Sequence, residues 1–279
     1  MTSMADIFAF FAELLSYDFI VRAMAVGILV ALCAALLGVT LVLKRYSMIG
    51  DGLSHVGFGA LAVAMSLNLA PLEISIPVVL FSAFMLLRIS ENSRIKGDAA
   101  IALISSSALA IGVIVVSMTT GMNADVCNYM FGAILALSRS DVYLSVAVAV
   151  AVLILYVLSY NRIFAVTFDE DFARAGGTDA SRYNMLIAGL TAMVIVVGMR
   201  MMGAMLISSL IIFPALTAMR VFASFRSVVI CSAVLSVLCF IIGMAVSFGI
   251  STPAGASIVV ANLAAFVLFS AAGKAGLKF

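Results

Sequence analysis

The sequence predicts an all-α membrane protein, a polytopic bundle of transmembrane helices. Apolar residues make up 65% of the 279 residues, charged residues only 10%, and the mean hydropathy is +1.29. Soluble domains contain about 25% charged residues, so this composition indicates an integral membrane protein. The apolar runs are continuous, whereas a transmembrane barrel needs alternating polar residues, so each span closes its backbone hydrogen bonds as a helix.

Apolar stretches recur along the whole chain and leave no room for a sizeable soluble domain. A hydrocarbon core about 30 Å thick takes roughly 20 apolar residues per helix, so we expect eight or nine spans with short connections. We predict a single transmembrane domain over residues 1–279, with spans at 20–43, 53–70, 74–87, 99–118, 142–159, 185–199, 203–222, 228–248 and 254–272. The third and sixth are short, and residues 119–141 are interpreted as a partial or interfacial helix.

The basic residues predict the orientation, because Lys and Arg collect on cytoplasmic loops. They fall mainly on alternate connections: Lys44, Arg45, Arg88, Arg94, Lys96, Arg162, Arg174, Arg182, Arg220, Arg226, Lys274 and Lys278. Nine spans with the N-terminus outside and the C-terminus inside fit this pattern. Residues 1–18 lack a basic n-region and are interpreted as an outer amphipathic segment rather than a signal peptide. The net charge of +2 is explained by topology, so we expect no nucleic-acid partner.

Several kinds of catalytic site are excluded by the motifs. The sequence has no Walker A glycine loop, so we expect any ATP hydrolysis to occur on a separate subunit. A single histidine excludes a zincin helix, and no Gly-x-Ser-x-Gly elbow is present. These absences favour a transporter over an enzyme.

The only histidine, His55, follows Asp51 by four residues at the start of the second predicted span. Ionisable residues in spans are costly and indicate function by default. This spacing places both side chains on one helical face, where an oxygen and an imidazole nitrogen can meet one divalent cation. Alternatively, Asp51 caps a helix start, the role we expect for Asp98 before the fourth span. A cap does not explain the imidazole, but the residues alone leave both interpretations open.

The longest polar connection, within residues 160–184, combines charged and small residues. Glu170, Asp171, Ala173 and Gly177 are the candidates in it for contact with another protein. Small residues allow close approach by a partner backbone, and charges fix the register of the two surfaces. The alternative is a solvated cytoplasmic loop.

A proline interrupts the seventh predicted span. Pro214 releases the carbonyl four residues earlier and kinks the helix, and Ser208 and Ser209 can re-satisfy backbone groups. A kinked helix rich in small residues suits the moving wall of a pathway, although static bundles also contain such helices.

Five motifs, in order, resemble the permease subunits of bacterial zinc/manganese/iron-type ABC importers. They are Gly-Asp-x-Leu-Ser-His at 50–55, "DAAIALISSSALAIGV" from Asp98, "YMFGAILAL" from Tyr129, "GAMLISSLIIFPALTA" from Gly203 and "TPAGASIV" from Thr252. The resemblance covers residues 28–272. One position departs from it: the family often has an aspartate where Ser251 stands, which weakens the case for a second carboxylate ligand near Pro253.

The resemblance implies that Asp51 and His55 belong to the metal path and that a cytoplasmic helix near Asp171–Gly177 contacts an ATPase subunit. It also implies a bacterial inner-membrane location, a second copy of the chain, and an external solute-binding protein that delivers the ion. The divalent metal is then the substrate rather than a permanently bound cofactor. The wording of the motifs favours zinc, with manganese next and iron behind.

Two other functions stay open. A stand-alone secondary carrier needs no ATPase surface, but the sequence shows no convincing inverted repeat of the kind many carriers have. An intramembrane enzyme that uses Asp51 and His55 lacks a third catalytic group at useful spacing.

Overall fold

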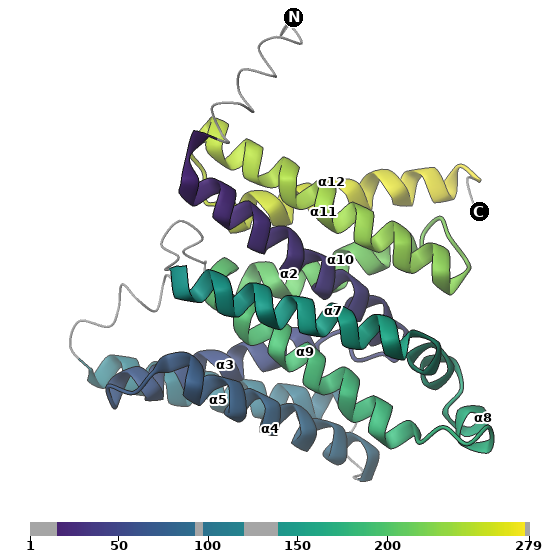
Figure 1. Ribbon diagram of the computed structural model, residues 1–279, viewed down its shortest axis with the longest axis horizontal. Helices are drawn as coiled ribbons and strands as arrows, with labels where there is room; N and C mark the ends of the chain where they lie inside the picture. The colour runs from purple at the N-terminus through teal and green to yellow at the C-terminus, as the bar shows by residue number, and fades with distance from the viewer. Residues whose placement is uncertain (1–15, 93–96, 120–138, 277–279) are drawn as a thin grey trace, which may run out of the picture.

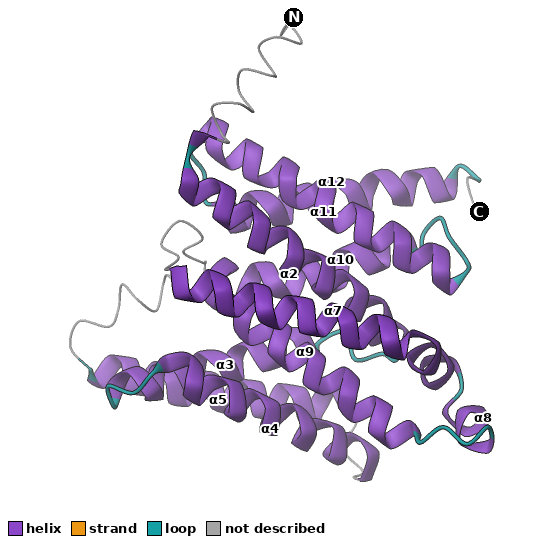
Figure 2. Cartoon of the chain, in the orientation of Figure 1, coloured by secondary structure: helices purple, strands orange, loops and turns teal. Residues whose placement is uncertain are grey.

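The computed structural model describes residues 16–92, 97–119 and 139–276, and within these ranges it contains helices and turns but no strand (Figure 2). The predicted all-α class is therefore confirmed. Most of the predicted outer segment at 1–18, and of the predicted partial helix at 119–141, lies outside the described residues.

Ten helices occur in the described ranges, and each of the nine predicted spans corresponds to one of them. The nine are α2 (Asp18–Leu43), α3 (Ile49–Ser66), α4 (Pro71–Asn92), α5 (Gly97–Met118), α7 (Arg139–Phe168), α9 (Ala180–Met202), α10 (Ala204–Ala218), α11 (Phe225–Ile250) and α12 (Ala254–Lys274). The tenth, α8 (Glu170–Ala175), is a short helix between α7 and α9.

Seven of the described helices are long and apolar enough to cross a membrane, so the predicted eight or nine spans is slightly high. Among the helices that correspond to predicted spans, the two exceptions are α3 and α10. Asp51 and His55 lower the hydropathy of α3, and α10 has only 15 residues, fewer than a bilayer core requires.

The third and sixth predicted spans are longer than expected. Helix α4 has 22 residues and α9 has 23. Both continue past the apolar run into polar residues. The extension of α9 is fixed at its start, where the Asp179 carboxylate accepts a hydrogen bond from the Arg182 N–H at 3.3 Å.

The centre of the bundle is formed by α2, α9 and α10, which lie between the other helices (Figure 1). In the most apolar 18-residue window of α9, 78% of residues are buried, against 17% in α12. Helix α3 packs mainly against α5 and α4, and also contacts α9 and α10. The outer helices therefore expose apolar faces of the kind that lipid covers.

One end of the bundle carries α8, the α10–α11 turn and the C-terminal end of α12 (Figure 1). The end of α2 at Lys44, the α7–α9 connection and the α10–α11 turn all hold basic residues. We call this end the basic end. Its position agrees with the alternation of basic connections on which the predicted orientation rests.

Candidate metal path and coupling helix

Asp51 and His55 lie one turn apart on α3 and face each other. The His55 Nε2 atom is 3.5 Å from Asp51 Oδ2, and the two side chains are 24% and 43% exposed, respectively. Two ligand atoms that bind one tetrahedral zinc at about 2.1 Å lie roughly 3.4 Å apart. The pair therefore has a spacing compatible with both side chains binding the same ion.

The start of α3 bears on the capping interpretation. The helix begins at Ile49, and its N-cap residue, Met48, makes no side-chain capping bond. Asp51 lies in the first turn, where a carboxylate favours the helix dipole, but its side chain interacts with His55 and Ser208. The side chain of Asp98, for which we predicted a cap at the start of α5, lies outside the described residues.

Ser208 of α10 joins the pair. Its hydroxyl can donate to the Asp51 carboxylate or to the Ala204 carbonyl, which is 3.0 Å away. Ser209 instead donates to the Leu206 carbonyl at 2.9 Å and serves the backbone of its own helix. Pro214 is buried farther along α10. The structure thus brings Ser208 to Asp51, although the two residues are far apart in the sequence.

The side-chain ligands around this pair are few. The described residues contain no group of three or more His, Cys, Asp or Glu side chains that could hold a metal ion. A closed structural zinc site has four protein ligands, whereas a transport path has to release its ion. Two ligands on one helix suit a passing ion whose other positions are filled by water, backbone oxygens or a second chain.

The predicted coupling region is largely helical. Helix α7 continues to Phe168, and α8 follows after Asp169, whose carboxylate accepts a hydrogen bond from the Phe172 N–H at 2.9 Å. After α8, Gly177 has φ +79, a conformation that other L-residues rarely adopt. A glycine is therefore required for the turn that leads into α9.

Glu170 faces the body of its own protein. The Lys44 ammonium donates to Glu170 Oε1 at 2.7 Å, and the Asn184 amide donates to the same oxygen at 3.0 Å. Lys44 also donates to Asn184 Oδ1. Burial raises the pKa of Glu170, but the hydrogen bonds from Lys44 and Asn184 outweigh it and hold the pKa below its usual value. This cluster, Lys44–Glu170–Asn184, ties the end of α2 to α8 and α9.

Ala173 also faces inward, whereas other residues of α8 face outward. Ala173 is buried against Val166 of α7 and Ala180 of α9. Asp171 is exposed, and so is Phe172, with 76% of its surface accessible. Phe172 is not among the predicted contact residues, although an aromatic between charged residues in "DEDFARAGG" is a recognisable signal for an interface.

Ser251 ends α11 in the left-handed conformation, with φ 55. Its neighbour Thr252 bonds to Ser257, with 2.8 Å between the hydroxyl oxygens. This turn lies between α11 and α12, and no described contact joins it to Asp51 or His55.

Comparisons with known proteins agree with this architecture. The family model described as the ABC 3 transport family matches residues 16–273. A manganese transport system membrane protein, MntC of Halalkalibacterium halodurans, is 27% identical over 95% of this chain and 91% of its own. The high-affinity zinc uptake system membrane protein ZnuB of Haemophilus influenzae is 29% identical over 90% of this chain and 97% of its own.

A solved structure extends the similarity to three dimensions. A chain of the structure titled PsaBC from Streptococcus pneumoniae in complex with Fab superposes with a TM-score of 0.84 at 29% identity. The match covers 94% of this chain and 95% of the other. With the family model matching nearly the whole helical bundle, this chain belongs to the ABC 3 transport family.

Proposed function

We propose that this chain is the membrane permease of an ATP-driven importer of divalent transition-metal ions, most simply zinc, with manganese next and iron behind. The observation that carries the proposal is the Asp51–His55 pair, with 3.5 Å between facing ligand atoms, beside Ser208 of α10. Membership of the ABC 3 transport family, and relatives named for manganese and zinc transport, support the same substrate class.

The choice among metals rests on ligand chemistry. Imidazole suits zinc, whereas carboxylate and water suit manganese, and the pair offers one nitrogen and one carboxylate ligand. The separation of the two ligand atoms fits the short bonds of tetrahedral zinc. Zinc is therefore the first candidate, and a site with one imidazole leaves manganese as the alternative.

The same proposal assigns α8 to an ATPase subunit in the cytoplasm. Asp171, Phe172 and Gly177 form its outward surface, and the Lys44–Glu170–Asn184 cluster links that surface to α2 and α9. Helix α9 leads through Gly203 into α10, which carries Ser208 beside Asp51. A movement of α8 would thus have a continuous route to the metal pair. An external solute-binding protein and a second permease copy complete the proposed assembly in the inner membrane.

Substitution of the pair tests the metal path. In cells whose metal uptake depends on this chain, Asp51→Asn and His55→Ala should insert normally but reduce uptake at least tenfold, because each removes one of two ligands. Asparagine in the first turn gives up a helix-dipole interaction of typically about 0.3–1 kcal/mol, which the bundle should tolerate, but it binds a divalent ion far more weakly than aspartate. The measurement is cellular zinc, manganese and iron content, which also identifies the metal.

Ser209→Ala is the matched control, since Ser209 lies beside Ser208 but its described hydrogen bond is to Leu206 within α10. It should keep normal uptake. Wild-type uptake by purified, reconstituted Asp51→Asn and His55→Ala proteins would return both residues to a structural role. Uptake driven by an ion gradient without an ATPase subunit would favour the secondary carrier instead.

A further inference from the structure

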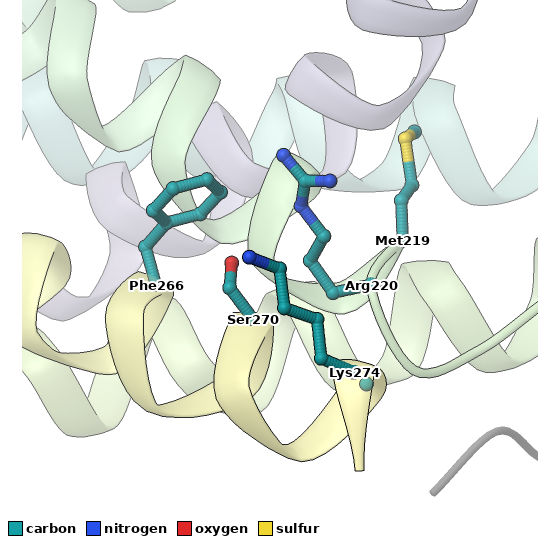
Figure 3. A pocket seen from close by; sticks show the side chains of 6 residues that line it. Met219, Arg220, Phe266, Ser270 and Lys274 are labelled. Carbon is teal, nitrogen blue, oxygen red and sulfur yellow. The ribbon is translucent and has the colours of Figure 1, made fainter. Parts of the chain in front are cut away.

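A pocket of about 750 Å³ opens at the basic end of the bundle, and none of its lining residues belongs to α3 or α8. It lies between the end of α10 and the last turns of α12 (Figure 3). Its lining consists of Met219, Arg220, Phe266, Ser270, Gly273 and Lys274. Two of these six residues are cationic and none is acidic, so the pocket favours an anion.

The position of Arg220 is set by its neighbours. Its guanidinium lies over the Phe266 ring, 5.2 Å from the centroid. A Cβ added at Gly273 would come within 2.6 Å of the Arg220 carbonyl, so glycine is needed for this close approach of α12. Among the described residues, neither Arg220 nor Lys274 forms an ion pair with a carboxylate. The part of the chain that the structure describes thus places two cations at one pocket and pairs neither with an acidic group.

Ser270 supplies a second, independent indication. Its hydroxyl oxygen is shielded from solvent and has no hydrogen-bond partner among the described residues. Other helical hydroxyls in this chain, such as those of Ser208 and Thr217, bond back to the carbonyl four residues earlier. In Figure 3 the Ser270 hydroxyl and the Lys274 ammonium extend into the same space. A shielded hydroxyl without a partner is costly, and a phosphate oxygen would satisfy it once the neighbouring Lys274 side chain turns towards the ligand.

Helix dipoles explain part of this arrangement. Helices α10 and α12 both end near the pocket, and a cation near a helix C-terminus is favourable. That role accounts for Lys274 in the last turn of α12. It accounts neither for the volume of the pocket nor for the unpartnered hydroxyl of Ser270.

The surroundings indicate which phosphate compound fits. Next to Phe266 of the pocket, α12 exposes Val267, with 57% of its surface accessible. In a membrane protein, such apolar surface next to a basic pocket contacts acyl chains. We propose that the pocket binds the phosphodiester headgroup of an anionic phospholipid of the cytoplasmic leaflet, with its acyl chains along α12.

The test uses the full-length chain, which contains no tryptophan, so a single Val267→Trp reporter gives a unique fluorescence signal. The protein is reconstituted in vesicles that contain brominated phosphatidylglycerol or brominated phosphatidylcholine, and quenching measures the relative affinity of the two lipids. We expect a preference for phosphatidylglycerol that falls roughly fivefold for each cation removed by Arg220→Gln or Lys274→Gln. Ser270→Ala should lower it by about threefold.

Arg226→Gln is the matched control, because Arg226 is an exposed cation at the start of α11 and does not line the pocket. It should leave the preference unchanged. If the Arg220→Gln/Lys274→Gln double variant keeps the wild-type preference for phosphatidylglycerol, the proposal is overturned. Inorganic phosphate that abolishes the preference, where chloride of equal ionic strength does not, would assign the pocket to a free anion. Loss of ATPase co-purification by the double variant with the lipid preference intact would assign it to a protein partner.

Discussion

Asp51 and Glu170 are both carboxylates in the first turn of a helix, but their surroundings differ. Glu170 receives hydrogen bonds from Lys44 and Asn184, and its bonds are used to hold α8 against α2 and α9. Asp51 faces one imidazole and one hydroxyl, and its side chain stays 43% exposed. A carboxylate with strong fixed donors is suited to holding structure, whereas one with weak partners remains available to a passing cation.

The comparison assigns Glu170 to holding α8, which the proposed function places in the cytoplasm. The sharpest test is therefore to establish on which side of the membrane α8 lies. In a background without Cys127 and Cys231, Asp171→Cys should not react with an impermeant thiol reagent in intact cells and should react fully after lysis. Asp171 is exposed on α8, so its reactivity reports sidedness rather than burial. Leu67 directly follows the C-terminal end of α3, the end farther from Lys44, and is also exposed. Leu67→Cys should therefore react in intact cells. Labelling of Asp171→Cys from outside would reverse the predicted orientation.

The second way is to remove the outward aromatic of α8. Phe172→Ala should weaken co-purification of the ATPase subunit about 30-fold, because truncation of a central aromatic at an interface typically costs at least 2 kcal/mol. Metal binding by the permease itself should be unaffected, since Phe172 does not contact Asp51 or His55.

Phe168→Ala is the matched control for that substitution. Phe168 is also exposed, but its ring packs on Phe164, with 5.0 Å between centroids, and on Phe225. It should have a much smaller effect on assembly. Equal effects of the two substitutions would show that α8 is not the docking helix.

A third, smaller effect sharpens the contrast between the two carboxylates through pH. The pKa of Glu170 is below its usual value while α8 is held against α2 and α9 of its own chain. The contribution of Glu170 to the stability of that packing is therefore complete at pH values above the ordinary glutamate pKa. It is lost as the pH falls through the lowered value. A spin label at Asp171→Cys should therefore become more mobile in acid, and added Glu170→Gln should remove that pH dependence. An unchanged pH profile in Glu170→Gln would exclude Glu170 as the group responsible.

Most of the helical architecture is predictable from the sequence, because apolar runs of sufficient length have few alternatives in a membrane. The ends are less predictable. The span expected at 185–199 is α9, Ala180–Met202, because a cap at Asp179 extends the helix through polar residues. The span expected at 203–222 is shorter, ending at Ala218, where a turn leads towards α11. Local hydrogen bonds, which hydropathy does not report, set both boundaries.

In the candidate sites, contacts within one helix are predictable from the sequence, whereas contacts between helices are not. The facing of Asp51 and His55 follows from their spacing of four on one helix. The approach of Ser208 depends on the packing of α10 against α3, which no spacing along the chain reveals. For Ala173, small size suggests contact with a partner, but α8 turns this residue towards α7 and α9. Which side of a short helix faces inward is decided by tertiary packing.

The length of α10 has a consequence for the electrostatic barrier to ion transfer. Its 15 residues span about 22 Å, whereas the hydrocarbon core of a bilayer is about 30 Å thick. The surrounding helices are longer, so α10 alone does not cross the core, and the unpaired backbone groups at its ends need polar partners from the protein. Under the proposed function, these backbone groups offer an ion that passes Ser208 and Asp51 polar contacts inside a region that otherwise has a low dielectric constant.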